Sequence, residues 1–466
     1  MNSQERSDEG IAQKNPTVTI SIIAISYLLL IVDGSVTTTA LPDIRNQFNM
    51  SSSTLSWVQN SYSLAFGGLL LLGARIGDLL GRLRMFVSGL FGFVISSLMV
   101  AFAPSTEILL IGRICQGVAA AVLAPSTLVL LSISFPKNPL RARAFAIYSS
   151  ITGIGTTFGL VLGGFVTDAF SWRWAFLINL PIGIILIFAA KKYLIESGKH
   201  SGRIDYWGSI TSIFGMSLLV FGLVNSSDDG WSDSVTVLCL ISSIFVLALF
   251  VFIETRTPRP LMPLHLLKSR HRSGSNFARF LLVGSMAGYW FFVSQFLQIA
   301  KGFSPLQTGV AFLPMTLASF GIAFLVPRLS RLLGDSSILV AGLFTVMLGT
   351  FWLSRLSINS SFFWHILLPL FFVGIGQGAS TIRLSTASMH GVNSHDAGAA
   401  SGIVSAAVQL GNAFGLSLLL SIASTLTDRG ESAAISIEHT TRIALASGGS
   451  LIAIALITTL VFVVKD

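Results

Sequence analysis

The chain has 466 residues, of which 52% are hydrophobic and only 11% are charged. A soluble chain carries about a quarter charged residues, so this composition excludes a typical soluble protein and indicates a membrane protein. The net charge of +9 does not point to a nucleic-acid partner, because the basic residues lie in alternate short loops rather than on one face.

Apolar stretches that are long enough to cross about 30 Å of hydrocarbon follow one another along the chain. The polar residues 1–16 lead into a stretch that is too long for the core of a signal peptide, so we expect a retained first span. The stretches predict fourteen transmembrane spans, at residues 17–41, 54–74, 84–103, 107–133, 142–167, 172–190, 205–224, 233–253, 275–300, 307–327, 337–356, 361–384, 396–426 and 441–464.

The charges of the loops orient these spans. If the N-terminus lies in the cytoplasm, most of the 29 Lys and Arg residues fall in inside loops, in agreement with the positive-inside rule. A miscounted span would invert every later loop and destroy this bias. We therefore predict fourteen spans with both termini in the cytoplasm.

Two short patterns recur in the sequence. Residues 155–162 read GTTFGLVL and residues 411–418 read GNAFGLSL, while Arg113–Gly117 and Gly374–Gly378 form a second pair. Chance similarity between glycine-rich membrane helices is the alternative, but the pairs keep their order and orientation, as parallel repeats should. We predict a cytoplasmic tail at 1–16, a six-helix bundle at 17–190, a linker at 191–204, an inserted hairpin at 205–253, a linker at 254–274 and a second six-helix bundle at 275–466.

Several longer motifs carry a family resemblance. They are LIVDGSVTTTALPDI (30–44), GARIGDLLGRLRMF (73–86), IGRICQGVAAAVLAPS (111–126) and GIGTTFGLVLGG (153–164). Together they resemble the major facilitator superfamily, and most closely its fourteen-span drug:proton antiporter branch, the bacterial multidrug and antibiotic exporters. The chain departs from the branch's motifs at Ala74, Leu79 and Leu160, and spans 9 to 14 have no carboxylate in their interiors. The resemblance implies the fold and leaves the substrate class open.

Asp33 is the one carboxylate that the predicted spans place well inside the membrane. An ionised side chain there is costly unless it is paired or protonated, so Asp33 is a candidate proton carrier; a permanently paired structural acid is the alternative. Arg113 in span 4 is its natural partner, either directly or through water, and the resemblance implies that this arginine tunes the protonation of the acid. Gln116 lies one turn along the same face and could extend the polar track.

Two further motifs are expected to serve the movement of the halves. The resemblance implies that the loop residues Asp78, Gly81, Arg82 and Arg84 latch the halves together in the outward-facing state; a solvated turn is the alternative. The span 5 glycines allow close helix contact, and they are Gly153, Gly155, Gly159, Gly163 and Gly164.

Intramembrane polar and aromatic residues are candidates for the substrate cavity. Tyr289 and Trp290 lie mid-span with Phe291 and Phe292, and aromatic faces at that depth suit flat lipophilic ligands; packed or lipid-facing aromatics are the alternative. The uncharged polar candidates, which could equally hold helices together, are Gln295, Gln377, Gln409 and Asn412.

The sequence contains no phosphate-binding G-x-x-x-x-G-K-[ST] loop, so we expect neither ATP-driven transport nor an enzyme, and no cofactor or metal. We predict a monomeric transporter of the bacterial cytoplasmic membrane that exchanges small lipophilic drugs or antibiotics for protons by alternating access. A single acid favours about one proton per cycle and neutral or monocationic substrates, although Arg113 would also suit weak anions. The alternatives are a dedicated exporter of one antibiotic or metabolite, proton-coupled uptake, and a non-transporting membrane sensor.

Overall fold

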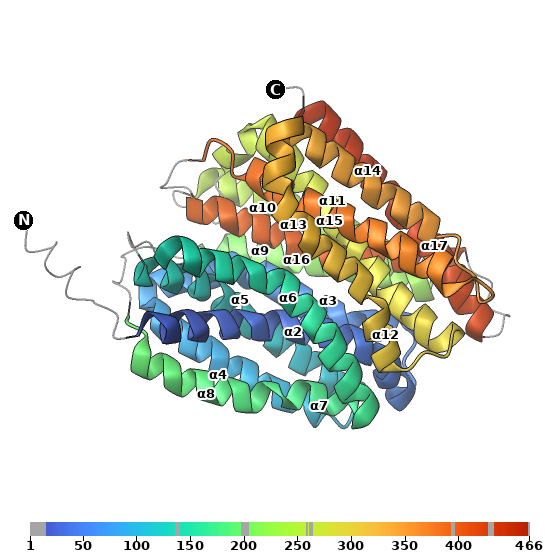
Figure 1. The fold of residues 1–466 in the computed structure, drawn as a ribbon, viewed down its shortest axis with the longest axis horizontal. Coiled ribbons are helices and arrows are strands. Elements are labelled where there is room, and N and C mark those ends of the chain that lie inside the picture. The colour runs from blue at the N-terminus through green and yellow to red at the C-terminus, as the bar shows by residue number, and fades with distance from the viewer. Residues whose placement is uncertain are drawn as a thin grey trace, which may run out of the picture.

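The computed structural model describes residues 15–135, 140–196, 205–257, 260, 264–392, 397–426 and 433–464, and the regular secondary structure in these ranges is helical. Two bundles of long helices lie side by side, one formed by the N-terminal and one by the C-terminal part of the chain (Figure 1). The helices of the first bundle are α2 (Pro16–Phe48), α3 (Ser52–Leu80), α4 (Arg82–Ala101), α5 (Thr106–Ser134), α6 (Leu140–Ala169), α7 (Trp172–Leu177) and α8 (Asn179–Tyr193).

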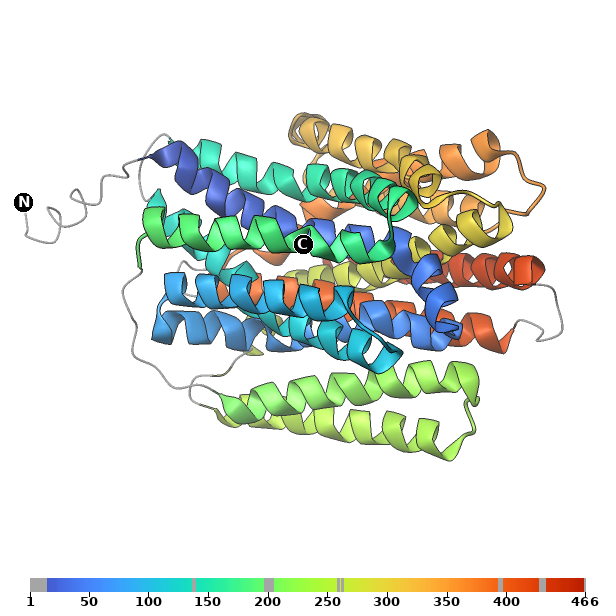
Figure 2. The same ribbon diagram turned by 90° about the horizontal axis from the view of Figure 1, so that it is seen from below.

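The second bundle follows a helical hairpin. The hairpin is formed by α9 (Tyr206–Asp228) and α10 (Ser234–Arg256), and it lies along one side of the molecule (Figure 2). The remaining elements are η1 (Leu264–Lys268), α11 (Arg270–Gln295), η2 (Phe296–Ala300), α12 (Pro305–Ala311), α13 (Leu313–Leu333), α14 (Asp335–Leu353), η3 (Phe363–Leu367), α15 (Leu368–Ser388), α16 (Ala397–Thr425) and α17 (Ala433–Phe462).

Local sequence signals set where these helices begin and end. Pro16 lies in the first turn of α2, and Asn49 ends that helix in the left-handed conformation. The Ser51 hydroxyl then caps α3, while the carboxylates of Asp205 and Asp233 accept backbone hydrogen bonds at the starts of α9 and α10. Each helix of the hairpin therefore starts at its own capping residue.

Twelve helices in the described part of the chain are long and apolar enough to cross a membrane, and the bent helix Ser52–Leu80 would make a thirteenth. The α6 helix is not among them. The surroundings of several of its residues lie outside the described part of the structure. The all-helical membrane fold is thus confirmed, whereas the count of fourteen spans and the side on which the termini lie stay predictions.

Equivalent glycines make equivalent contacts in the two bundles. In the first bundle, Gly159 of α6 packs directly on α2, whose Val32 Cα would lie 3.1 Å from a Cβ at that position. Its counterpart in the sequence repeat, Gly415 of α16, packs on Gly284 of α11, the first helix of the second bundle. Likewise Gly117 of α5 abuts the second helix of its own bundle, and Gly378 of α15 does the same in the second. These contacts support the parallel repeat inferred from sequence.

We expect Gly415→Ala to lower the melting temperature of the purified protein, because a Cβ there would overlap the backbone of Gly284, which cannot rotate away. Overpacking of this kind typically costs about 1–3 kcal/mol. Gly321→Ala is the matched control, since Gly321 is also helical and has no atom near its would-be Cβ. Equal melting temperatures for the two variants, measured by thermal unfolding in detergent, would show that the close helix contact is not needed.

Hydrogen bonds join the two bundles at the end of the molecule where α2 finishes, opposite the end where α2 begins. Arg45 donates to the side chain of Gln295 (3.1 Å), Gln298 donates to the backbone oxygen of Thr39 (3.2 Å), and Asn60 donates to Ser417 (2.9 Å). An apolar cluster that includes residues of both bundles lies in the same region. The bundles are therefore packed together at this end.

Candidate functional site

Asp33 and Arg113 form a buried ion pair. Asp33 lies in the middle of α2 with 2% of its surface exposed, and Arg113 lies in α5 with 1% exposed. An Nη1 of Arg113 is 2.7 Å from Oδ2 of Asp33. The pairing is direct, and the carboxylate and the guanidinium offset the high cost of burying either one alone.

Three uncharged side chains complete the surroundings of the carboxylate. Gln116 donates to Oδ1 of Asp33 (3.1 Å) and accepts from Arg113 (2.8 Å). Asn179, the first residue of α8, also donates to Oδ1 (2.9 Å). The Ser97 hydroxyl of α4 accepts from both amides, at 2.8 and 3.2 Å. Asp33 thus holds four helices of the first bundle in one network.

Arg113 has further partners besides the acid. Its Nε donates to the backbone oxygen of Val58 in α3 (2.9 Å), and its guanidinium carbon lies 4.5 Å from the ring centre of Tyr62. The phenyl ring of Phe176 lies 5.8 Å away on another helix. Backbone, aromatic and carboxylate groups therefore surround this cation, so it has little capacity left to bind a substrate anion.

The glycines of α6 contact the part of α2 that carries Asp33. A Cβ at Gly159 would lie 2.8 Å from Cβ of Ser35, and one at Gly163 would lie 2.7 Å from Cα of Val36. Gly155 packs on the same helix one turn earlier, whereas Gly164 faces Pro305 and Leu306 of the second bundle. The surroundings of Gly153 lie outside the described residues. The α6 helix therefore contacts both the helix of the acid and the opposite bundle.

The loop between α3 and α4 forms its own ion pair. Arg82 lies 2.5 Å from Asp78, four residues earlier. Gly81 has a φ of 109°, which favours glycine, and the carboxylate of Glu196 lies directly beneath it. Glu196 accepts hydrogen bonds from the backbone N–H groups of Leu83 (2.8 Å) and Arg84 (3.1 Å). Glu196 therefore caps the N-terminus of α4. None of these contacts involves the second bundle, so the latch between the halves stays a prediction.

We expect Glu196→Ala to lower the melting temperature and to slow transport. The substitution leaves the first N–H groups of α4 without their acceptor, and the loss of such a cap typically costs about 1 kcal/mol. Thermal unfolding and initial transport rates would be measured beside Asp229→Ala, which removes an exposed acid from another helix end. A Glu196→Ala protein that matches this control in both measurements would contradict the role of the cap.

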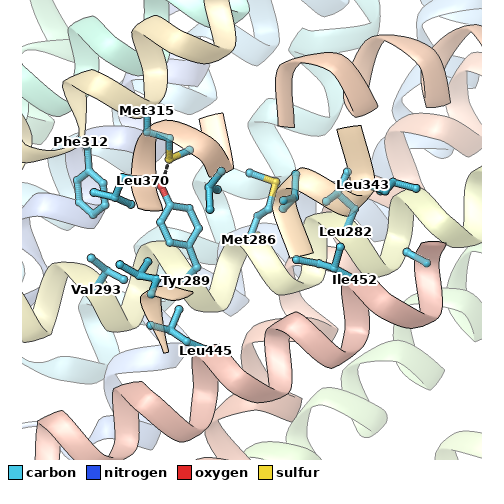
Figure 3. Close-up of a cluster of buried hydrophobic side chains, with 14 of the residues drawn as sticks. Leu282, Met286, Tyr289, Val293, Phe312, Met315, Leu343, Leu370, Leu445 and Ile452 are labelled. Carbon is cyan, nitrogen blue, oxygen red and sulfur yellow. Dashed lines mark hydrogen bonds between the residues drawn. The ribbon is translucent and has the colours of Figure 1, made fainter. Parts of the chain in front are cut away.

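The aromatic candidates of α11 lie in packed surroundings. Tyr289 is buried in a cluster of the second bundle, and its hydroxyl points at the sulfur of Met315 (Figure 3). Trp290 packs beside it, with its ring centre 4.7 Å from that of Phe312. The structure does not bring these rings to Asp33, and contact with a substrate stays a prediction for both.

The polar candidates lie at several separate places. Gln295 accepts from Arg45 across the bundles, and Asn412 donates to Gln409 (3.3 Å) on the same helix. Gln377 lies on α15, and its buried Oε1 has no hydrogen-bond partner. In the described ranges, no group of three His, Cys, Asp or Glu side chains is close enough to hold a metal ion.

Sequence reasoning did not find Ser97, Asn179 or Glu196. Asn179 could have been suspected from the sequence, because it is an amide within an apolar stretch. Ser97 could not, because many serines in membrane helices bond only to the backbone of their own helix. An apolar pocket between α2, α6 and α8 was also missed; Leu28, Phe158 and Ile182 line it, and Asn179 lies at its wall.

Comparisons with known proteins agree with this architecture. The sequence profile of the Major Facilitator Superfamily matches residues 23–416. The cephamycin export protein CmcT of Amycolatopsis lactamdurans is 35% identical over 423 residues, which cover 89% of this chain and 87% of the relative. The puromycin resistance protein pur8 of Streptomyces alboniger is 33% identical over 434 residues, which cover 90% and 85%.

Solved structures share the fold at low sequence identity. A crystal structure of the peptide transporter POT in complex with sulfate superposes with a TM-score of 0.72 at 12% identity, and the match covers 99% of this chain and 98% of that one. This likeness supports the fold and carries no information about the substrate.

Proposed function

Because the chain belongs to the major facilitator superfamily, we propose that it exports lipophilic antibiotics or drugs from a bacterial cell in exchange for protons, by alternating access. The export of antibiotics is suggested by relatives that are named for cephamycin export and puromycin resistance. The observation that supports proton coupling is the buried pair of Asp33 and Arg113, the one ion pair in the described part of the chain that is almost wholly shielded from solvent on both sides.

The network gives protonation a mechanical consequence. When Asp33 is ionised, it holds Arg113, Gln116 and Asn179, and through them α5 and α8, against α2. A proton on the carboxyl group removes the charge that balances Arg113 and weakens these contacts. Because α2 packs on the glycines of α6, and α6 packs on α12 of the second bundle, a shift of α2 can reach the interface between the halves.

We further propose fourteen spans with both termini in the cytoplasm. In this orientation, the hydrogen bonds between Arg45 and Gln295 and between Asn60 and Ser417 lie toward the outside. The structure would then represent a state whose outer ends are closed. Substrate would enter from the cytosol or the inner leaflet while Asp33 releases its proton inward. After the halves rock, protonation of Asp33 from outside would accompany release of the substrate.

A susceptibility panel in an efflux-deficient bacterial host tests this proposal. Cells that express the protein should tolerate higher concentrations of at least one of puromycin, lincomycin, a cephamycin and ethidium than cells with the empty vector. A protonophore should abolish the efflux of that compound. Efflux that persists with a protonophore, or a panel with no change at all, would contradict proton-coupled drug export.

The same panel separates a broad from a dedicated exporter. The relatives reported above are each named for a single antibiotic, which favours the dedicated exporter as the second candidate. Increased tolerance to several unrelated compounds would support multidrug export, whereas increased tolerance to one compound would support the dedicated function.

A further inference from the structure

A partly buried arginine lies between the two bundles. Arg279 is in the third turn of α11, and its Nη1 donates to the hydroxyl of Ser385 and to the backbone oxygen of Thr381 on α15. Across the interface, α2 packs against α11, and Tyr27 of α2 lies near the guanidinium. Among the described residues, no carboxylate lies within ion-pair distance of Arg279. Within the described part of the chain, its contacts are with neutral dipoles.

Polar atoms around Arg279 lack hydrogen-bond partners. The Nε of Arg279 is buried and has no acceptor. Asn276 lies one turn earlier on the same face of α11, and its Oδ1 is buried and has no donor. On α15, Gln377 and Ser388 flank the two residues that Arg279 contacts, and each has a buried side-chain oxygen without a partner. Buried polar groups are normally hydrogen-bonded, so the unsatisfied Nε of Arg279 and Oδ1 of Asn276, one turn apart on α11, indicate a site for a polar ligand.

The facing bundle supplies aromatic surface. Tyr27 stacks on Tyr148 of α6, with ring centres 4.4 Å apart, and the Tyr148 hydroxyl is held by Thr127 at 2.9 Å. The stacked rings can contact the flat apolar part of a ligand. A cation on one side and aromatic rings on the other suit an amphipathic anion.

We propose that Arg279 binds the negatively charged group of the substrate, and that the substrates include lipophilic compounds with one carboxylate or a similar anionic group. The planar guanidinium matches a carboxylate with two parallel hydrogen bonds, and an anion would supply the missing counter-charge. Arg113 is less suited to this role, because its Nη1 already donates to Asp33 and Gln116 and its Nε donates to the backbone oxygen of Val58. The inference rests on the proposed export function and deepens it.

An anionic substrate would change the charge balance expected from the sequence. When one monoanion leaves as one proton enters, two positive charges move inward in each cycle. Transport would then respond strongly to an inside-negative membrane potential, whereas exchange of a monocation for one proton would not respond to it.

Two matched fluorescent probes test the inference. Dansyl-phenylalanine carries a free carboxylate, and dansyl-phenylalanine amide differs only in having a neutral amide there. We expect the purified full-length protein to bind the carboxylate probe about ten-fold more tightly than the amide, because a hydrogen bond to a charged group is worth at least that factor. Arg279→Gln should weaken binding of the carboxylate probe to the level of the amide and so remove this preference, while Arg279→Lys should retain part of it.

The controls separate this site from proton coupling. Asp33→Asn should keep the preference for the carboxylate, because Asp33 is not in contact with Arg279. If Asp33→Asn loses proton-driven export but still prefers the carboxylate probe, the result bears on proton coupling and leaves the proposed site at Arg279 intact. Equal binding of the two probes by the unmodified protein, no binding of either, or a preference that survives in Arg279→Gln would overturn the inference. The comparison of the two probes in the unmodified protein tests the inference even if a variant fails to fold.

Discussion

Asp33→Asn is expected to abolish export driven by a pH gradient while the protein still inserts and folds. Asparagine has nearly the same shape as aspartate and can keep the hydrogen bonds with Gln116 and Asn179, although it leaves Arg113 without its counter-charge and should therefore lower the melting temperature. It cannot bind or release a proton, so the cycle would lose its coupled step. The transport of a panel compound into proteoliposomes under an imposed pH gradient should fall to the level of empty liposomes.

This loss should be confined to coupled transport. Exchange of labelled for unlabelled compound across the membrane needs no net proton movement and should continue in Asp33→Asn. Asp229→Asn, which alters an exposed acid at the end of α9, is the matched control and should behave like the unmodified protein. Export by Asp33→Asn at the normal rate under the pH gradient would remove Asp33 from the mechanism.

Arg113→Leu is expected to destabilise the protein more than any other single change in the network. It would leave Asp33 buried without its cation, and breaking a buried pair on one side typically costs about 3–5 kcal/mol. It would also leave the backbone oxygen of Val58 and the side chain of Gln116 without their donor. We expect a large fall in melting temperature and no measurable transport.

A double-mutant cycle isolates the pair itself. Adding Asp33→Asn to Arg113→Leu removes the unpaired charge, so the double variant should be more stable than Arg113→Leu alone. Melting temperatures of the four proteins in the same detergent give the result. If the two substitutions lower stability additively, Asp33 and Arg113 do not interact as the distance of 2.7 Å indicates.

The sequence was sufficient to predict the all-helical membrane fold and the buried position of Asp33 for physical reasons. Hydrocarbon thickness fixes the length of a span, and a lone carboxylate in an apolar stretch is conspicuous, so α2 and Asp33 could be found without a structure. The repeat also predicted which glycines are equivalent, and Gly159 and Gly415 do make matching contacts. The predicted first span ended at residue 41, but α2 continues to Phe48. Hydropathy identifies only the apolar stretch, so it does not show how far the helix extends beyond it.

Contacts between residues distant in sequence could not be predicted. Asn179 lies 146 positions from Asp33, and Glu196 lies 113 positions from Leu83, so no local pattern links either pair. Arg279 was visible as an intramembrane cation, yet its lack of a carboxylate partner among the described residues depends on how α11, α15 and α2 pack. The aromatic run at Tyr289 resembled a ligand surface in the sequence, whereas the structure packs Tyr289 into a core.

Proton movement driven by the substrate tests the central proposal most directly. Proteoliposomes that contain a pH-sensitive dye would be given an outward or inward gradient of the compound identified by the panel, with no initial pH gradient and the membrane potential clamped. The proposed exchange predicts a change of internal pH, opposite in sign for the two gradient directions, and its absence in Asp33→Asn. Substrate flux without any proton movement in the unmodified protein, or equal proton movement in Asp33→Asn, would contradict it.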